Sequence, residues 1–467
     1  MAHIDTIKRT KILATLGPSV DDKAVLEKII RCGVNACRLN FSHGDEAQRL
    51  MQINNIREIS HRLGRHIAIV QDLQGPKIRF GMLKDNARFD IHEGETYGLT
   101  YGIEHDGGNN LPSQYDLSDK CEVGDNIFLF DGKIRAVVQS IEGKTVWVKA
   151  MNSGYIMSRK AINLPDMKGG KAPVLTEKDM ADLEWGLTQD IDYTAISFIH
   201  HADDVRKLKD IIKSKGSDRP VIVKLETRAG ADPANLEDIV READGMMVAR
   251  GDLAVEAGYE IVPVVERQIL QLCQKYNKLC IVATQMLGSM VEQPEPTRAE
   301  VNDVATAAML GADATMLSDE SAAGKYPVEA VTAMDTTSRY TQAHPEFYTP
   351  YERHSFNPEI EAVAKSAVEM AQGIRAKAIV TEDSDMSLAR ALANQKANFV
   401  NIAMLPTERL ANRASLLSFT RSFVVELGHG EEKLHELGER DFFGGDYTVV
   451  YVSHTDNDAY NMKVISR

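Results

Sequence analysis

Short apolar runs alternate with longer amphipathic stretches along most of the chain. The apolar runs are rich in β-branched residues and are bounded by turn residues, a pattern that predicts strands. We expect strands at residues 10–16, 35–41, 66–72, 193–199, 220–226, 245–251, 279–285 and 313–319. Most of these runs precede a helical pattern, often opened by Asp, Ser, Thr or Pro. We expect helices at 22–32, 45–64, 201–215, 256–277, 298–310 and 326–342.

Eight strand–helix units in succession favour one architecture. The strands are apolar on both faces, as are strands of a parallel sheet that helices cover. The unit count predicts an α/β fold of the (β/α)₈ TIM-barrel type rather than an open sheet. We assign residues 1–78 and 164–343 to this barrel.

Two further domains interrupt or follow the repeat. Between Asp72 and a helical pattern at 176–187 the chain is rich in Gly, turn signals and short alternating strands, as in a small all-β module. Loops that follow barrel strands lie at the catalytic end, so residues 79–163 are expected to form an inserted all-β lid domain, a small β-barrel. After a linker-like segment, strands and helices alternate again, which predicts a C-terminal α/β domain at 344–467.

Composition narrows the class of protein. A net charge of −14 disfavours nucleic acid as a partner, because phosphate backbones require a basic surface. The first residues lack the apolar core of a signal peptide, and no apolar run is long enough to span a bilayer. The five cysteines are odd in number and have no C-x-x-C spacing, which argues against a disulfide framework or a zinc site. We therefore expect a cytoplasmic protein without a membrane partner.

Polar residues recur where the predicted strands end. In a barrel these ends meet at one mouth, so the following side chains should converge: Thr15, Arg38, Asn40, Ser42, Asp72, Ser197, Lys224, Glu226, Asp252, Thr284 and Ser318. An unpaired buried charge costs several kcal/mol. The charges in this ring must therefore be matched to one another, to a metal or to a charged substrate.

The chemistry of this ring points to a metal and an anion. Glu226 and Asp252 follow neighbouring strands, and two carboxylates with water and substrate oxygens are a usual set of ligands for Mg²⁺. Lys224 and Arg38 would meet an anion, so phosphoryl transfer or enolate chemistry is indicated. Each feature alone has a plainer reading, since Lys224 and Glu226 can form a structural ion pair and Asp252 can cap a helix.

Several motifs resemble those of pyruvate kinases, in order and over nearly the whole chain. They are "RTKILATLGPS", "CRLNFSHG", "DLQGPKIR", "KLET", "DGMMVARGDLAVE", "ATQML", "PTRAEVNDVA" and "MLSDESAAGKYPVEAV". The resemblance implies transfer of the phosphoryl group of phosphoenolpyruvate to ADP, giving pyruvate and ATP in glycolysis. It also implies a barrel with a lid, a C-terminal domain for regulation or oligomerisation, an allosteric homotetramer, and Mg²⁺ or Mn²⁺ as cofactor.

Roles follow from this resemblance position by position. Glu226 and Asp252 match the metal ligands, Lys224 matches the lysine that neutralises the phosphoryl group in flight, and Arg38 matches a phosphate-binding arginine. The remaining matches are the backbone cradle for the substrate carboxylate at Ala249, Arg250 and Gly251, the substrate-contacting Thr284, and the nucleotide contacts Thr15, Arg38, Asn40, His43, Arg79 and Lys160. The group that protonates the enolate stays open.

One departure from the family pattern concerns potassium. In members that need K⁺, Asn40, Ser42, Asp72 and the carbonyl of Leu73 match the ligands of the ion, and a glutamate stands where this chain has Lys77. A tethered ammonium can supply the positive field that K⁺ otherwise provides. We therefore expect an enzyme that does not require K⁺.

A second departure lies in the C-terminal domain. Members activated by a sugar bisphosphate hold a phosphate in a loop patterned roughly T-x-S-G-x-T/S, but this chain has "TEDSDMSLA". Glu382, Asp383 and Asp385 add negative charge, and Asp385 replaces the glycine. Fructose 1,6-bisphosphate is not expected to be an activator, although the loop can also be a simple solvated turn.

Two rival functions use similar residues. A Mg²⁺-dependent aldolase or lyase acting on pyruvate enolate needs the same metal and cations, but it does not need a nucleotide site. Arg79 and Lys160 indicate a nucleotide site and therefore argue against this function. A non-catalytic scaffold that kept the fold is expected to lose Lys224, Glu226 or Asp252, and all three are present.

Overall fold

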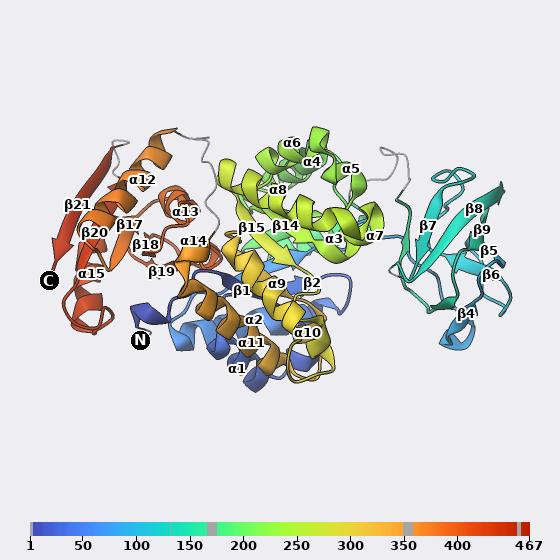
Figure 1. The fold of residues 1–467 in the computed structure, drawn as a ribbon, viewed down its shortest axis with the longest axis horizontal. Coiled ribbons are helices and arrows are strands. Elements are labelled where there is room, and N and C mark those ends of the chain that lie inside the picture. The colour runs from blue at the N-terminus through green and yellow to red at the C-terminus, as the bar shows by residue number, and fades with distance from the viewer. Residues whose placement is uncertain (1–2, 131, 166–174, 349–357, 455–458) are drawn as a thin grey trace.

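Eight parallel strands close into a barrel at the centre of the molecule (Figure 1). The computed structural model describes residues 3–130, 132–165, 175–348, 358–454 and 459–467. The barrel strands are β1 (Lys11–Leu16), β2 (Ala36–Asn40), β3 (Ala68–Asp72), β12 (Tyr193–Ile196), β13 (Val221–Leu225), β14 (Gly245–Ala249), β15 (Leu279–Ala283) and β16 (Ala314–Leu317). Neighbours follow the order β1-β16-β15-β14-β13-β12-β3-β2. The predicted TIM barrel is confirmed, and each strand lies inside a range expected from the apolar runs.

Helices pack around the barrel, and several of them start at residues that the capping rules favour. They are α1 (Lys23–Cys32), α2 (Glu46–Leu63), α3 (Glu177–Leu187), α4 (Ala202–Ser214), α5 (Arg228–Ala231), α6 (Pro233–Glu242), α7 (Arg250–Ala257), α8 (Val262–Lys275), α9 (Arg298–Met309), α10 (Asp319–Ala322) and α11 (Pro327–Gln342). Thr176 and Thr297, for example, form capping boxes with Asp179 and Glu300.

The helix expected at 256–277 is wrong at its start. Residue 256 belongs to α7, which ends at Ala257 with Gly258 as its C-cap, and α8 begins only at Val262. Gly258 has φ 105°, a conformation that favours glycine and ends the helix, and a proline occupies the first turn of α8. The short helix α7 is therefore separate from α8, and it starts directly at the end of β14.

The inserted segment forms a separate all-β body with its own core. Its strands are β4 (Phe89–Ile91), β5 (Thr96–Tyr101), β6 (Asn110–Ser113), β7 (Asn126–Leu129), β8 (Ile134–Glu142), β9 (Thr145–Ala150), β10 (Gly154–Ile156) and β11 (Ile162–Asn163). Six of them form an open sheet in the order β11-β7-β8-β9-β5-β6, while β10 pairs with β4. Phe80, Tyr97 and Ile127 are among its buried core residues. The sheet does not close on itself, so the lid is half a barrel.

The C-terminal part contains a mixed sheet in the order β19-β18-β17-β20-β21, in which only β21 is antiparallel to its neighbour. Its strands are β17 (Ala378–Glu382), β18 (Val400–Leu405), β19 (Thr420–Val424), β20 (Thr448–His454) and β21 (Tyr460–Ser466). The accompanying helices are α12 (Pro358–Gly373), α13 (Ser387–Asn394), α14 (Glu408–Ala414) and α15 (Gly430–Glu439). The lid and this sheet lie on opposite sides of the barrel (Figure 1).

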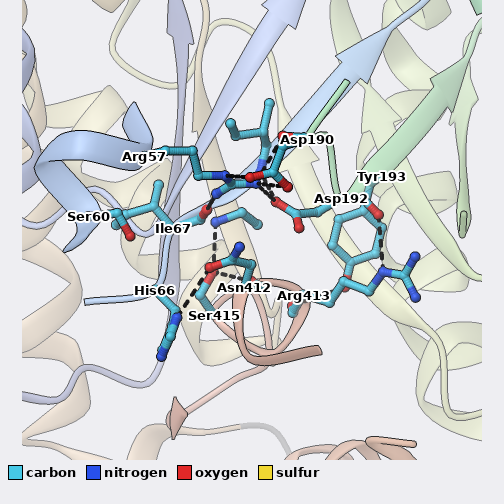
Figure 2. A network of polar contacts seen from close by, with 12 residues as sticks. Arg57, Ser60, His66, Ile67, Asp190, Asp192, Tyr193, Asn412, Arg413 and Ser415 are labelled. Carbon is cyan, nitrogen blue, oxygen red and sulfur yellow. Dashed lines mark hydrogen bonds and ion pairs between the residues drawn. The ribbon is translucent and has the colours of Figure 1, made fainter. Parts of the chain in front are cut away.

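Helix α14 and the residues after it close the amino-terminal end of the barrel (Figure 2). Leu416 belongs to the buried cluster inside the barrel, together with Leu13 and Met247. Tyr193 Oη donates a hydrogen bond to the carbonyl of Arg413 at 3.0 Å, and the backbone N–H of Ala68 donates to Ser415 Oγ at 3.0 Å. The opposite end, where the strands terminate beside the lid, is left for the site. Within the described residues, no helix is both long and apolar enough to cross a membrane.

Candidate active site

Lys224 lies at the centre of the charged residues in the barrel mouth. Strand β13 alternates its side chains, so Lys224 and Glu226 both leave the chain on the inner side. Lys224 Nζ donates to Ser197 Oγ at 2.9 Å and lies 2.8 Å from Glu226 Oε1 and 3.4 Å from Asp72 Oδ1. Burial lowers the pKa of Lys224, but the charges of Asp72 and Glu226 outweigh burial and the net shift is upward. The lysine therefore stays an ammonium at neutral pH.

Asp72 holds two cations in one arrangement. Its Oδ2 accepts a hydrogen bond from Arg38 Nε at 2.5 Å, while its Oδ1 faces Lys224. Arg38 Nη1 also donates to Thr15 Oγ1 at 3.0 Å, because Thr15 and Arg38 are register partners on β1 and β2. The strand register thus joins three neighbouring strand ends into one network that can face an anion.

Glu226 and Asp252 are the two carboxylates of the mouth. Glu226 is almost fully buried, and its Oε2 accepts a hydrogen bond from the backbone N–H of Phe198 at 3.2 Å. Its Oε1 faces Lys224 but accepts no well-oriented hydrogen bond from the part of the chain that the structure describes. Burial raises the pKa of Glu226 against the opposing Lys224 charge, and the charge of Asp252 raises it further.

Asp252 belongs to the first turn of α7, next to Lys77. Its Oδ1 accepts a hydrogen bond from Lys77 Nζ at 2.6 Å. Burial would raise the pKa of Asp252, but the Lys77 ammonium outweighs burial and lowers it. The two carboxylates fit a hard cation, since one buried oxygen has no well-oriented donor and both groups are oxygen ligands. No group of three or more His, Cys, Asp or Glu among the described residues is arranged for a metal, so an ion here would need oxygens from substrate and water as well.

The start of α7 presents backbone groups beside Thr284. The N–H of Gly251 donates to Thr284 Oγ1 at 2.8 Å, and Thr284 Oγ1 donates to the carbonyl of Ala283 at 2.7 Å. Thr284 has φ 67°, which is strained for a β-branched residue and commonly marks a functional position. The Arg250 guanidinium donates to the carbonyls of Ala283 and Thr284 and pairs with Asp303. Arg250 can therefore contribute only its backbone to a substrate.

The residues expected to contact a nucleotide lie on the β1–β2 side of the mouth and on the lid. Arg79 forms an isolated bridge with Ala161 at the base of the lid, next to Lys160. Burial and then the charge of Arg79 lower the pKa of His43, and Lys160 and Arg38 add to this. His43 therefore faces a cluster of cations from both the barrel and the lid, as a site for a polyphosphate requires.

The residues expected at a monovalent-ion site are engaged within the protein. Asn40 Oδ1 accepts from the N–H of Ser42 at 3.1 Å, and the carbonyl of Leu73 accepts from Ser197 Oγ at 3.0 Å. Asp72 is shared by Arg38 and Lys224. The Lys77 ammonium donates a hydrogen bond to Asp252. Lys77 thus lies beside Asp252, one of the two carboxylates expected to bind the divalent metal, a position that sequence reasoning did not foresee.

Glu256 is a residue of this region that the sequence did not reveal. Lid residue Asn163 donates through Nδ2 to Glu256 Oε1 at 2.9 Å. Burial raises the pKa of Glu256 to about 7. Both residues line a cavity of about 690 Å³ between lid and barrel, along with Lys77, Phe198 and Arg228. A glutamate in an amphipathic helix is usually solvated, so no local pattern signals this contact.

Comparison with known proteins shows which family the chain belongs to. A family model described as pyruvate kinase, barrel domain, matches residues 7–331. The chain is 36% identical over 446 residues to a pyruvate kinase of Thermotoga maritima, covering 92% of this chain and 94% of the relative. The chain belongs to the pyruvate kinase family. A pyruvate kinase of Clostridium perfringens is 35% identical over 418 residues, covering 88% of this chain and 87% of the relative.

A solved pyruvate kinase has the same architecture. A crystal structure of a pyruvate kinase from Cryptosporidium parvum superposes with a TM-score of 0.88 at 30% identity, covering 99% of this chain and 97% of that chain. Family membership confirms the resemblance seen in the motifs and the enzyme class, a phosphotransferase of the pyruvate kinase type. It also agrees with the three-part fold described above. The individual site residues stay predictions that rest on their geometry.

Proposed function

We propose that this pyruvate kinase transfers the phosphoryl group of phosphoenolpyruvate to ADP at the barrel mouth, with a divalent cation and without a required K⁺. The observation that carries this proposal is the network in which Asp72 holds Arg38 and Lys224 beside Glu226. It presents two cations and a buried carboxylate to one small volume. Phosphoryl transfer needs this combination, because the transferred group spreads negative charge over its oxygens.

Lys224 and Arg38 are assigned to the phosphoryl group. The Lys224 ammonium is fixed by Ser197 and two carboxylates, so little reorganisation is needed when charge develops on the phosphoryl oxygens. Arg38 offers a planar fork for phosphate oxygens, held by Asp72 and Thr15. Together they position the group between donor and acceptor.

Glu226 and Asp252 are assigned to Mg²⁺ or Mn²⁺. When bound there, the ion supplies positive charge to the carboxylate and phosphate of the substrate. The backbone at Ala249, Arg250 and Gly251 opens a helix and can receive the substrate carboxylate, while Thr284 holds the Gly251 N–H. Binding of the ion at Asp252 must compete with, or displace, the Lys77 ammonium.

Thr15, Arg38, Asn40, His43, Arg79 and Lys160 are assigned to the nucleotide. Arg79 and Lys160 belong to the lid and the others to the barrel, so a bound nucleotide would bridge the two. Their charges converge near His43, whose pKa they lower after burial. A lyase would have no use for this cluster. Direct measurement of ATP formed from phosphoenolpyruvate and ADP distinguishes the two functions.

The metal assignment is tested by Glu226→Gln, which keeps the shape of the side chain and removes its charge. We expect Mn²⁺ binding, followed by electron paramagnetic resonance, to weaken by at least about tenfold. Glu329→Gln, on the exposed start of α11, is the matched control. Unchanged Mn²⁺ affinity in Glu226→Gln would remove Glu226 from the metal site.

Potassium independence is supported by the position of Lys77. Its ammonium lies 2.6 Å from Asp252, inside the charged cluster, where a tethered cation supplies a permanent positive field. We expect a coupled assay in tetramethylammonium buffer to keep most of the activity measured in KCl. Activity that falls to a few per cent without K⁺ would refute this assignment.

The hydrogen bonds of the carboxylates at the end of β17 support the absence of activation by fructose 1,6-bisphosphate. At the end of β17, Glu382 Oε1 accepts from the N–H groups of Gly428 and Gly430, at the start of α15. Asp383 Oδ2 accepts from the N–H groups of Leu388 and Ala389, in the first turn of α13. These helix starts are where a phosphate would bind, and internal carboxylates already use them. A homotetramer and a cytoplasmic location remain expectations from the sequence.

A further inference from the structure

A polar contact joins the lid to the barrel helix that carries Asp252. Asn163, on the lid strand β11, donates through Nδ2 to Glu256 Oε1 at 2.9 Å. Asn163 is 3% exposed and Glu256 is 9% exposed, so water has little access to this hydrogen bond. Both side chains line the cavity of about 690 Å³ between lid and barrel. The contact is thus a buried attachment of the lid to the barrel.

Packing alone does not account for an amide at position 163. Its Oδ1 is buried and has no hydrogen-bond partner among the residues that the structure describes. A buried polar atom without a partner is unfavourable, and a leucine of similar size would avoid it. The amide supplies what leucine cannot, a donor for Glu256 Oε1.

On the lid side, the backbone around Asn163 holds the two lid cations. Asn163 lies three residues after Lys160. The intervening Ala161 forms an antiparallel bridge with Arg79, and the N–H of Phe80 donates to the carbonyl of Lys160 at 2.9 Å. Because these backbone bonds tie the segments together, a shift of Asn163 also moves the two cations.

On the barrel side, the contact is made by helix α7, which lies on the side of the barrel that faces the lid (Figure 1). Asp252 and Glu256 are four residues apart on α7, so their side chains lie on the same face. Val255 packs against the lid at Gly132, where a Cβ would lie 2.8 Å from Val255 Cγ2. One short helix therefore carries a metal carboxylate in its first turn and contacts the lid in its last.

We propose that Asn163 and Glu256 are a positioning pair that fixes the lid cations Arg79 and Lys160 relative to the metal site. This role rests on the proposed function, in which these two cations bind the nucleotide. A nucleotide that bridges lid and barrel must hold its terminal phosphate beside the substrate. A small displacement of the lid therefore impairs the use of ADP, although neither residue of the pair needs to touch it.

Asn163→Leu removes the hydrogen bond and keeps a side chain of similar size. We expect the KM for ADP to rise by at least about tenfold, because the lid cations lose their fixed position. Binding of phosphoenolpyruvate and Mn²⁺, which uses barrel residues, should change by less than about twofold. Asn109→Leu, at an exposed position of the lid, is the matched control and should keep the parent KM.

The double variant Asn163→Asp with Glu256→Gln exchanges donor and acceptor and leaves the total charge unchanged. The new amide can donate to the new carboxylate, so we expect the KM for ADP to return to within about threefold of the parent value. Recovery separates a positional role from a general loss of folding. An unchanged KM in Asn163→Leu, or no recovery in the double variant, overturns the positioning role.

The position of the lid can also be measured without turnover, by double electron–electron resonance in the unliganded full chain. Spin labels are attached to Val123→Cys on the lid and Lys207→Cys on α4, both exposed positions. Cys32→Ser removes the half-buried thiol, and the other four cysteines are buried. We expect a narrow distance distribution in the parent and the double variant and a broad one in Asn163→Leu.

The two measurements distinguish the positioning role from the function on which it rests. A parent that forms no ATP from phosphoenolpyruvate and ADP refutes the proposed function. A distance distribution that is the same in the parent and in Asn163→Leu refutes the positioning role, whatever the turnover.

Discussion

The two ends of the barrel differ in whether their positive charges are paired with carboxylates. At the mouth, Lys224 lies within 3.4 Å of two carboxylates and Arg38 shares one of them. At the closed end, Lys11, Arg65 and Arg421 meet carbonyl oxygens but no carboxylate within the described residues. Balanced charges let the mouth stay ordered before substrate binds. Positive charge at the other end has no carboxylate partner of this kind, which is unfavourable where the charge is buried.

The two ends also differ in what covers them. Parallel strands bring their carboxyl ends to the lid side, where loops can carry chemistry. Helix α14 covers their amino ends (Figure 2), and Leu416 packs into the barrel there. This end is therefore a packed interface with the C-terminal part. Substitutions at the mouth should therefore change turnover, and substitutions at the closed end should change stability or regulation.

Lys224→Met should have the largest effect. It removes the ammonium that faces the transferred group, and we expect kcat to fall by at least about 10³-fold. Binding of phosphoenolpyruvate, measured by fluorescence or calorimetry, should change far less. Lys207→Met on the exposed face of α4 serves as control. A variant that kept a tenth of the parent turnover would show that Lys224 does not act on the phosphoryl group.

Lys77→Glu should create a dependence on K⁺. It replaces the ammonium beside Asp252 with a second negative charge, and a free cation is then needed to restore the field. We expect activity in tetramethylammonium buffer to drop by about tenfold or more and KCl to recover most of it. The ratio of rates in the two buffers is the measurement. Equal rates of the variant in both buffers would show that Lys77 does not determine whether the enzyme requires K⁺.

Glu256→Gln should alter how stability depends on pH. Burial raises the pKa of Glu256 from 4.5 to about 7, so the folded chain binds this proton more tightly than the unfolded chain. The parent therefore loses stability as pH rises from about 4.5 to about 7, and the loss levels off above that range. Glutamine removes this contribution. The melting temperature of the variant minus that of the parent should increase across this window, whereas a difference that is flat with pH would contradict the assignment.

Tyr193→Phe should have the smallest effect, at the closed end. It removes the hydrogen bond from Tyr193 Oη to the carbonyl of Arg413, which is worth about 1 kcal/mol. We expect the melting temperature to fall by about 2 °C with kcat unchanged. Differential scanning calorimetry and the coupled assay report the two quantities. A lowered kcat at unchanged melting temperature would mean that the two ends are coupled more strongly than their packing suggests.

Much of the fold could be predicted because its determinants are local. Each barrel strand is a short apolar run followed by a helical pattern, and all eight predicted strands were confirmed. The two carboxylates of the mouth were also found from the sequence, since Glu226 and Asp252 follow successive strands. The break between α7 and α8 was missed because its signal, Gly258 with a positive φ, is a single residue inside a long amphipathic pattern.

Contacts between distant parts of the chain were not predictable in the same way. Lys77 and Asp252 are 175 residues apart, and Asn163 and Glu256 are 93 apart. Neither pair has a spacing or a periodicity that indicates contact. The carboxylate caps of Glu382 and Asp383 likewise depend on where α13 and α15 start relative to β17.

The sequence by itself determined the barrel, the inserted lid and the ring of polar residues at the strand ends, because side-chain period and chain order decide which residues face inward and at which end. Only the tertiary structure decided which charges are neutralised. Neutralisation depends on distances of a few ångströms between elements that chain order leaves free. The same residue types therefore form a balanced site at one end of the barrel and an excess of positive charge at the other.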